Sequence, residues 1–485
     1  MVFNKPTEFE LEGLPIKSRR LARLIYSDGD SPEKRGAFGE IGNYTGIPAG
    51  LYPHTLNIAK NSPSEFDRML AACALAEDHS SQVIEIIRSD KSSMVRAAAA
   101  VSLSEYGASE YCTKNLFDLY PTEKNEEVRA AYIQTIASAG SDDYAFKPLL
   151  KASQDESELV RAQAAIGLAK NEKGKSIAEK MLKADKSAYV RVAVAEELKC
   201  MTDELVSEAN RIMKTAKNKK MQEIAFYAMS SIRSEHSQKG LLDALRSNNE
   251  VIRWMAIDRI SYWNTEKIFG EILKMTDDTY WVARSNAWEA LGRMNLDKTV
   301  PLVLKKLHEE KESFVWSTMV KLVGQKDKIK FHEIIVRELE GKRPKFKQSA
   351  LFNLCYEEKE KALPVVEKIF IEGHLDDVLQ MLPYPIAQAK SSKAVEIIDK
   401  IIKKSEDPEV KIACIDALTQ IGSYGAYDVV KTLIKDKNSE IRELAMNSAD
   451  NIQNWGRSDP VSKHANKVTN SVIGRVSNFA RKLLR

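Results

Sequence analysis

The sequence predicts an all-α fold, an α-α superhelix (solenoid) of about thirteen helical hairpins. Three observations predict it. A pattern of about 14 residues recurs at intervals close to 31 residues along most of the chain. Within each copy the apolar residues are spaced as they are on one face of a helix. Hydrophobic residues make up 43% of the 485 residues and only 15 are prolines, so the chain can bury a large core without breaking many helices.

The repeated pattern is clearest at Asp155–Leu168, which reads D-E-S-E-L-V-R-A-Q-A-A-I-G-L. Each copy aligns on the position that Arg161 holds, here named the anchor. Successive anchors lie 28 to 33 residues apart. The copies at Gln222, Trp316 and Leu379 are weak on their own and are placed by this spacing. The anchors are Arg68, Arg96, Arg129, Arg161, Arg191, Gln222, Arg253, Arg284, Trp316, Lys347, Leu379, Lys411 and Arg442.

One period accommodates two helices of roughly ten to fourteen residues and two short turns. In the second half of the unit, Val160, Ala164 and Leu168 form one apolar stripe. A single hairpin cannot bury both of its faces, so neighbouring hairpins must stack. Small side chains such as those of Ala97–Ala100 allow the second helices to approach closely.

An acidic residue often stands six residues before the anchor, as Asp155 does before Arg161. At that turn, we expect the carboxylate to cap the second helix and to favour its positive end. We expect the arginine to pair with an acid of its own or the adjacent unit, and only Arg68 and Arg253 among the arginine anchors lack the preceding acid. This interpretation, a structural ladder, is favoured over a row of arginines offered to nucleic acid.

The pattern D-x-x-x-x-V-R-x-x-A-x-x-x-L at this period resembles HEAT repeats, most closely the short alanine-rich HEAT-like repeats of the phycobilisome-lyase type. The resemblance covers about residues 56–455. It implies an armadillo-like superhelix with the first helices on the convex side and the second helices on the concave side. Most members of the family are scaffolds and adaptors, a few are pigment-lyase subunits, and one group is similar to DNA glycosylases.

Two segments lie outside the repeats. Residues 1–55 are expected to form an N-terminal arm or cap, with a short basic helix at residues 14–25. The glycines from Gly36 to Gly50 predict irregular structure, and no Lys-Ser/Thr follows them as in a phosphate loop. Residues 456–485 predict a basic amphipathic helix. It would cap the last repeat, bind an acidic partner or nucleic acid, or, less favoured, lie on a membrane surface.

If the second helices line the concave face, positions two, six and nine after each anchor are expected to be exposed there. They include Ala131, Thr135, Gln163 and Gly167, and are mostly small and polar. A duplex-binding groove would need a stripe of Lys and Arg, which these positions lack. A protein or peptide partner therefore suits the face better.

Five of the six tryptophans fall between residues 254 and 316. Trp and Tyr beside Arg are typical of binding hot spots, although the tryptophans would also fit a core. A third alternative is a nucleotide pocket of Trp288, Asp258 and Arg284, the residue types that the resemblance to HEAT-like glycosylases implies. The candidate partner contacts are Arg253, Trp254, Arg259, Tyr262, Trp281, Arg284, Trp288, Arg293 and Trp316, with Lys463, Lys467, Arg475, Arg481 and Lys482 of the C-terminal segment.

No catalytic motif is recognisable in the sequence. The five cysteines form no C-x-x-C pair, the seven histidines form no H-E-x-x-H, and no apolar stretch is long enough to cross a membrane. We expect no cofactor, no metal and a cytoplasmic location. The lysines of 214–220 and the basic residues of 342–347 are interpreted as solvated turns, with phosphate contacts as the alternative.

The expected function is that of a non-catalytic scaffold or adaptor that holds a protein or peptide partner on its concave face. The alternatives are a nucleic-acid-binding or DNA-repair protein, which would use the basic loops and C-terminal segment, and a lyase-type accessory subunit. Function is expected where the repeat departs from its own pattern, as at Gln222 and Trp316.

Overall fold

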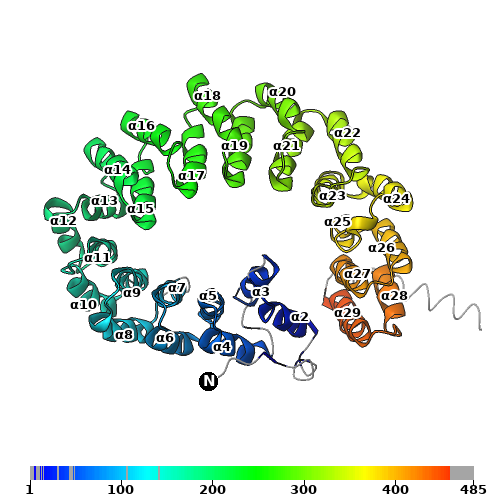
Figure 1. The fold of residues 1–485 in the computed structure, drawn as a ribbon, viewed down its shortest axis with the longest axis horizontal. Coiled ribbons are helices and arrows are strands. Elements are labelled where there is room, and N and C mark those ends of the chain that lie inside the picture. Colours follow the sequence, from blue (N-terminus) through cyan, green and yellow to red (C-terminus); the bar gives the residue numbers. More distant parts are fainter. Residues whose placement is uncertain are drawn as a thin grey trace, which may run out of the picture. The chain divides into compact units, whose positions relative to one another are not determined.

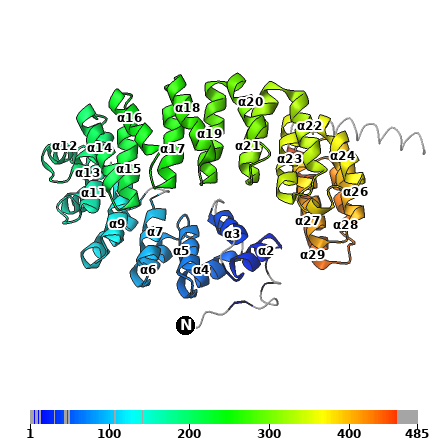
Figure 2. The same cartoon turned by 45° about the horizontal axis from the view of Figure 1, so that its top comes forward.

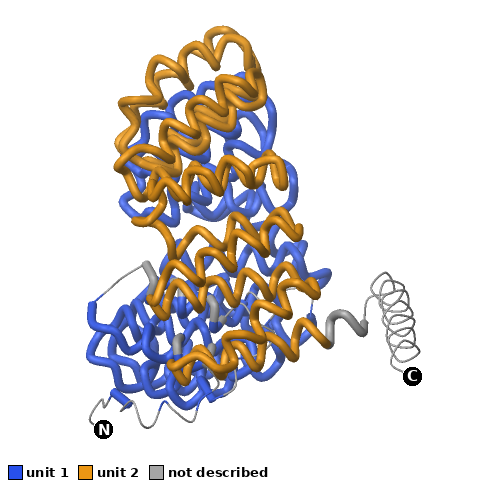
Figure 3. The backbone as a smooth tube through the Cα atoms, turned by 90° about the vertical axis from the view of Figure 1, so that its right-hand side faces the viewer, with its two compact units in different colours: residues 1–263 blue, residues 264–485 orange. Residues whose placement is uncertain are grey.

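A computed structural model describes residues 16–29, 32–42, 47, 50–104, 108–139 and 142–458, together with residues 5, 6, 11 and 14. These residues form α-helices and short 3-10 helices, and contain no β-strand. Consecutive helices form antiparallel hairpins that stack side by side (Figures 1 and 2), so the predicted all-α solenoid is confirmed. The chain divides into two compact units, residues 1–263 and 264–485 (Figure 3).

Unit 1 consists of hairpins whose even-numbered helices lie on the outer side and whose odd-numbered helices lie on the inner side (Figure 1). Its helices are α2 (Ile16–Ile25), α3 (Pro32–Gly42), α4 (Leu51–Asn61), α5 (Glu65–Ala74), α6 (Ser80–Ser89), α7 (Ser93–Ser102), α8 (Glu110–Leu119), η1 (Tyr120–Thr122), α9 (Glu126–Ser138), α10 (Asp143–Ala152), α11 (Glu158–Lys170), α12 (Lys175–Ala184), α13 (Ala188–Glu197), α14 (Asp203–Thr215), α15 (Lys219–Ser230), α16 (Glu235–Ala244) and α17 (Glu250–Ser261).

Unit 2 continues the same alternation of outer and inner helices. Its helices are α18 (Glu266–Lys274), η2 (Met275–Asp277), α19 (Trp281–Met294), α20 (Leu296–Lys306), α21 (Ser313–Lys326), α22 (Lys328–Leu339), α23 (Pro344–Glu358), η3 (Lys359–Ala362), α24 (Leu363–Ile371), η4 (Asp376–Val378), α25 (Pro383–Ala387), α26 (Ser392–Lys404), α27 (Pro408–Ile421), α28 (Tyr424–Leu433) and α29 (Ser439–Ser458).

The core lies between the two rows of helices, as the apolar stripes predict. In α11, Val160, Ala164 and Leu168 have no exposed surface. The helix packs against α9 and α13 on its two sides and against α10 and α12 of the outer row. The approach is close at Gly167, where an added Cβ would lie 2.8 Å from Leu149 and 2.9 Å from the Ala137 side chain. Small residues on the inner helices therefore allow the tight stacking.

The N-terminal segment contains one more stacked hairpin than the repeat pattern predicts. Helices α2 and α3 pack on α4 and α5, respectively. The prediction of irregular structure for the glycine-rich segment is wrong at Pro32–Gly42, because burial of Ala37, Phe38 and Ile41 overrides the low helix propensity of glycine. Lys34 is 3% exposed and its Nζ contacts Asp67 Oδ2 at 2.7 Å, as an anchor does in the later hairpins.

The hairpin at Leu379 departs most from the repeat. A 3-10 helix and the five-residue α25 occupy the place of a full inner helix, and Leu379 lies between them. Pro383 and Pro385 have no backbone N–H to donate to the carbonyls four residues earlier, so a continuous inner helix through Leu379 would lose these hydrogen bonds. The C-terminal contact residues Lys463, Lys467, Arg475, Arg481 and Lys482 lie outside the described residues, as does most of the predicted basic helix at 456–485.

Candidate functional site

The anchors form a row of ion pairs, here named the anchor ladder. Seven anchor side chains each reach the acid at the start of the next inner helix, and each such pair is one rung. Arg68, which lacks an acid before it, pairs in the same way. The rungs are Arg68–Asp90 at 2.7 Å, Arg96–Glu123 at 2.9 Å, Arg129–Asp155 at 3.2 Å, Arg161–Asp185 at 3.0 Å, Arg284–Glu310 at 2.9 Å, Lys347–Asp377 at 2.9 Å and Lys411–Asp436 at 3.0 Å.

The acid of six of these rungs accepts backbone N–H groups of its turn rather than capping a helix, which corrects the predicted capping role. Asp185 accepts the backbone N–H of Ser187 at 2.8 Å, and Ser187 itself caps α13. Burial raises the pKa of Asp185, but hydrogen bonds from Arg161 and the Ser187 backbone outweigh it and leave this pKa below its usual range. The carboxylate therefore stays charged beside Arg161 and joins two adjacent hairpins.

The ladder is interrupted between α13 and α17. Arg191 pairs with Glu208 of the outer helix α14 at 2.7 Å instead of reaching the next inner helix. Ala216 occupies the position six residues before Gln222, where an acid stands in other copies. Gln222 donates to the Ala216 carbonyl at 2.7 Å and accepts from Asn249 at 3.3 Å. Neutral amides thus replace the ion pair at this rung.

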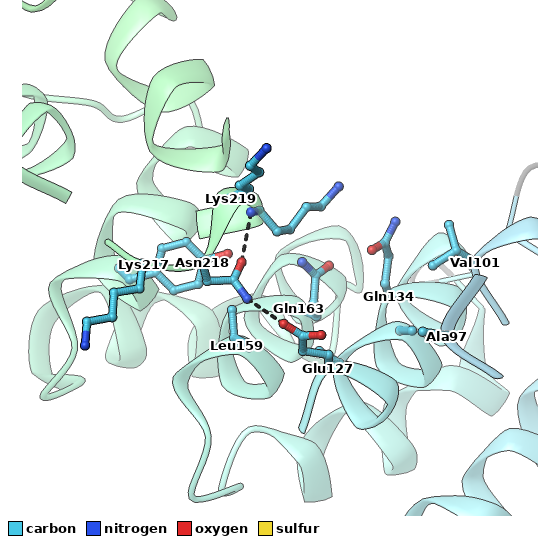
Figure 4. A pocket seen from close by; sticks show the side chains of 13 residues that line it. Ala97, Val101, Glu127, Gln134, Leu159, Gln163, Lys217, Asn218 and Lys219 are labelled. Carbon is cyan, nitrogen blue, oxygen red and sulfur yellow. Dashed lines mark hydrogen bonds between the residues drawn. The ribbon is translucent and has the colours of Figure 1, made fainter. Parts of the chain in front are cut away.

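A groove opens on the inner helices of unit 1 beside this interruption (Figure 4). Its volume is about 510 Å³. Four inner helices, α7, α9, α11 and α13, line it together with the turn that leads into α15. The lining residues are Ala97, Val101, Glu127, Ala130, Ala131, Gln134, Leu159, Gln163, Tyr189, Lys217, Asn218, Lys219 and Lys220. The groove is hereafter called the inner groove.

Asn218 holds the turn against α9, three hairpins earlier in the chain. Its Oδ1 caps α15 by accepting the backbone N–H groups of Lys220 at 2.8 Å and Met221 at 3.2 Å. Its Nδ2 donates to Glu127 Oε1 at 2.9 Å (Figure 4). Because the cap needs only the oxygen, the nitrogen remains available for this second contact.

Three polar side chains in the lining have unused hydrogen-bonding capacity. Gln134 of α9 is half-buried and Gln163 of α11 is 8% exposed, and neither amide bonds to another described side chain or backbone group. Tyr189 is 2% exposed and its hydroxyl has no hydrogen-bond partner among the described residues. Burial raises the pKa of Tyr189 well above its usual range, so the hydroxyl stays neutral. Unpaired polar groups at such positions are costly unless a ligand or water satisfies them.

The basic cluster at 214–220 separates into paired and unpaired lysines. Lys214 contacts Asp243 at 2.6 Å and Lys219 contacts Glu250 at 3.7 Å. Lys217 and Lys220 are exposed, and no described carboxylate lies within ion-pair distance of either. The edge of the inner groove that the turn forms is therefore positively charged.

The predicted concave positions are right in part, since Gln163, two after its anchor, lines the inner groove and Tyr262, nine after its anchor, is 63% exposed. Ala131, Thr135 and Gly167, at two or six positions after their anchors, are buried against neighbouring helices. Ala130 and Gln134, at one and five positions, lie more open and line the groove. One residue rotates a side chain by 100° around a helix, and packing on both sides leaves only a narrow exposed strip.

The predicted aromatic and arginine contacts fall into two groups. In unit 1, Arg259 is exposed, Tyr262 is 63% exposed, and Arg253 and Trp254 are half-buried. In unit 2, Arg293 is exposed, and Trp281 stacks on Phe314, 67% exposed, with ring centroids 5.6 Å apart.

Three residues of this set are corrected. Trp288 and Trp316 are 1% and 2% exposed, so they are core residues rather than exposed contacts, and Arg284 forms a rung with Glu310. The large apolar area of the indoles explains their burial. Trp288 and Arg284 also line a pocket of about 310 Å³ in unit 2, and Asp258 is not among its lining residues.

Sequence reasoning did not single out Tyr189, Gln134, Asn218 or Glu127. The available signal was the departure of the Gln222 copy from the repeat, since its turn contributes Lys217–Lys220. Over the part of the chain that the structure describes, no cluster of three or more His, Cys, Asp or Glu side chains is arranged to hold a metal. None of the described helices is both long and apolar enough to cross a membrane.

Comparison with known proteins gives one family match. The model for HEAT repeats matches residues 113–199 and 238–319, which include most of the inner-groove helices. No curated protein matches the sequence.

Similar solved structures include Kap121p bound to Ste12p, with 14% identity, a TM-score of 0.40 and 91% of this chain covered. Human deoxyhypusine hydroxylase in complex with glycerol has 15% identity and a TM-score of 0.24, covering 52% of this chain and 97% of its own length. This chain spans about 57% of the length of Kap121p. Two segments of this chain therefore match HEAT repeats, and its described helices stack as an α-solenoid.

Proposed function

We propose that this protein is a non-catalytic scaffold that holds a protein partner in the inner groove of unit 1. The observation that carries the proposal is the pair of unused amides of Gln134 and Gln163 in a groove of about 510 Å³. A partner that offers donors and acceptors would satisfy them when it binds. Small residues such as Ala97 and Ala130 leave room for its main chain.

The same lining argues against catalysis in the groove. General acid–base and nucleophilic catalysis need a positioned pair of titrating groups. Glu127 is the one carboxylate among the described lining residues, and it accepts a hydrogen bond from Asn218. Tyr189 is kept neutral by burial. We therefore propose binding without chemistry at this site.

Site-specific photo-crosslinking in cells tests the proposal. A benzophenone amino acid at Gln134 places the reactive group in the groove, and the same group at Lys180, exposed on the outer helix α12, is the control. We expect discrete protein adducts from position 134, identified by mass spectrometry, and none in common from position 180. Equal adducts from both positions, or none from position 134, would contradict the proposal.

A further inference from the structure

We propose that the inner groove receives an extended peptide segment rich in Asp and Glu. This inference rests on the proposed function, because it specifies the chemistry of the partner that the groove holds. Its evidence is the combination of unpaired amides and unneutralised lysines around one cavity.

The two glutamines suit the main chain of an extended peptide. Each primary amide offers donors and an acceptor, which match the C=O and N–H groups of a peptide unit. Gln134 and Gln163 come from the adjacent inner helices α9 and α11, which pack directly on each other. Packed helices lie roughly 8–10 Å apart and an extended chain rises about 3.3 Å per residue. About every third residue of the peptide would therefore meet a glutamine.

Tyr189 of the next inner helix, α13, forms part of the groove wall. Its hydroxyl is buried and unpaired among the described residues, so it does not face an incoming peptide. The amides of Gln134 on α9 and Gln163 on α11 are therefore the polar groups that the groove presents to a peptide main chain.

The lysines determine the charge of the segment. Lys217 and Lys220 have no carboxylate partner among the described residues. The described lining carries three lysines and one carboxylate, Glu127, which keeps its charge because its partner Asn218 is neutral. An acidic segment would gain attraction from both lysines at the edge of the groove. A single-stranded nucleic acid would also be attracted, but it would need exposed aromatic rings for its bases, and Tyr189 is only 2% exposed. The lining therefore favours an acidic peptide.

Fluorescence polarisation with the full chain tests this inference. The probe is a labelled peptide of alternating Glu and Ser, about ten residues long so that it spans three hairpins. A matched peptide with Lys in place of Glu and a single-stranded DNA of similar length and charge are the comparison probes. We expect the Glu peptide to bind and the Lys peptide not to bind, with DNA weaker than the Glu peptide.

Three double variants locate the binding. Lys217→Glu with Lys220→Glu should lower the affinity for the Glu peptide by about tenfold or more, since it reverses both unpaired charges. Gln134→Leu with Gln163→Leu should lower this affinity less, because the lysine charges remain. Lys175→Glu with Lys180→Glu makes the same charge change on the outer helix α12 and should have little effect. Circular dichroism of each variant checks that the helices are retained.

Several results would overturn the inference. These are a Glu peptide that binds no better than the Lys peptide, a lysine reversal in the groove with no more effect than the control on α12, and DNA that binds more tightly than the Glu peptide. The crosslinking experiment separates this failure from that of the scaffold. An adduct at position 134 that persists in the Lys217→Glu, Lys220→Glu background would keep the scaffold and reject the acidic segment.

Discussion

Two stretches of the inner row in unit 1 use the anchor position differently. From α5 to α13, four successive arginines each pair with an acid of the next hairpin, and both partners are largely buried. From α13 to α17, Arg191 turns to the outer helix and Gln222 forms only neutral hydrogen bonds. The helices continue through both stretches, so hairpin stacking does not depend on an ion pair at every step.

The two stretches differ in the turn before the inner helix, where the copy beside the groove lacks the acid of an ion pair. An intact turn carries an acid that is held by the preceding arginine, as Asp185 is by Arg161. The turn before α15 has no such acid, and its Asn218 contacts Glu127 across three hairpins instead. Loss of one local rung thus coincides with a long-range contact and with two lysines at the edge of the inner groove.

The largest expected effect comes from breaking an intact rung. Arg161→Ala leaves the buried Asp185 without its partner and should lower the free energy of unfolding by about 3 kcal/mol. Arg191→Ala is the matched change in the interrupted stretch, and should cost below about 1 kcal/mol because that pair is more exposed. Urea unfolding followed by circular dichroism measures both. Equal losses would show that the two stretches do not differ energetically.

Acidification should weaken the intact stretch first. The pKa values of Glu123, Asp155 and Asp185 lie below their usual ranges. Burial raises each of these pKa values, but hydrogen bonds from an arginine and from the backbone lower it by more. A lowered folded-state pKa gives stability that is present above the unfolded value, about 4, and is lost as pH falls. We expect the urea concentration at the unfolding midpoint to decrease once the pH is lowered below about 4. Asp185→Asn should be less stable at neutral pH and less sensitive to acid; an unchanged acid profile would contradict this.

Rebuilding the missing rung should raise the free energy of unfolding, by less than breaking an intact rung lowers it. Gln222→Arg with Ser247→Asp introduces an arginine and an acid six residues before Arg253, at the spacing of the intact copies. The new guanidinium can still donate to the Ala216 carbonyl, which Gln222 bonds now. We expect the double variant to gain about 1 kcal/mol in urea unfolding. Gln222→Arg alone is the control, and it should gain nothing because it adds a charge without its carboxylate.

The smallest expected effect concerns the contact across the groove. Asn218→Asp keeps the oxygen that caps α15 but replaces the donor to Glu127 with a second carboxylate. Amide hydrogen exchange at the start of α15 should quicken, with a loss of about 0.5–1 kcal/mol. Adding Glu127→Gln should restore slow exchange, because an amide can donate to the new carboxylate. No difference between single and double variants would show that the contact does not hold the turn.

The sequence predicts the repeats and their pairing because both depend on local spacing. The period near 31 residues, the apolar stripe of Val160, Ala164 and Leu168, and the arginine-to-acid offset are all readable from residue order. Trp288 and Trp316 were expected as partner contacts but are buried, because their exposure depends on which side of a helix meets its neighbour. The exposed strip of an inner helix is narrow, so among the predicted concave positions Gln163 lines the groove whereas Thr135 and Gly167 are buried.

The sequence by itself determined that this chain is an α-solenoid of helical hairpins resembling HEAT repeats, and where its repeats depart from their pattern. Only the tertiary structure decided that Asn218 meets Glu127, 91 residues away, and that Gln134, Gln163 and Tyr189 line one groove. The physical reason is that small rotations between hairpins accumulate along a solenoid. Each rotation results from the packing of many side chains, so contacts between distant hairpins are not encoded in any single repeat.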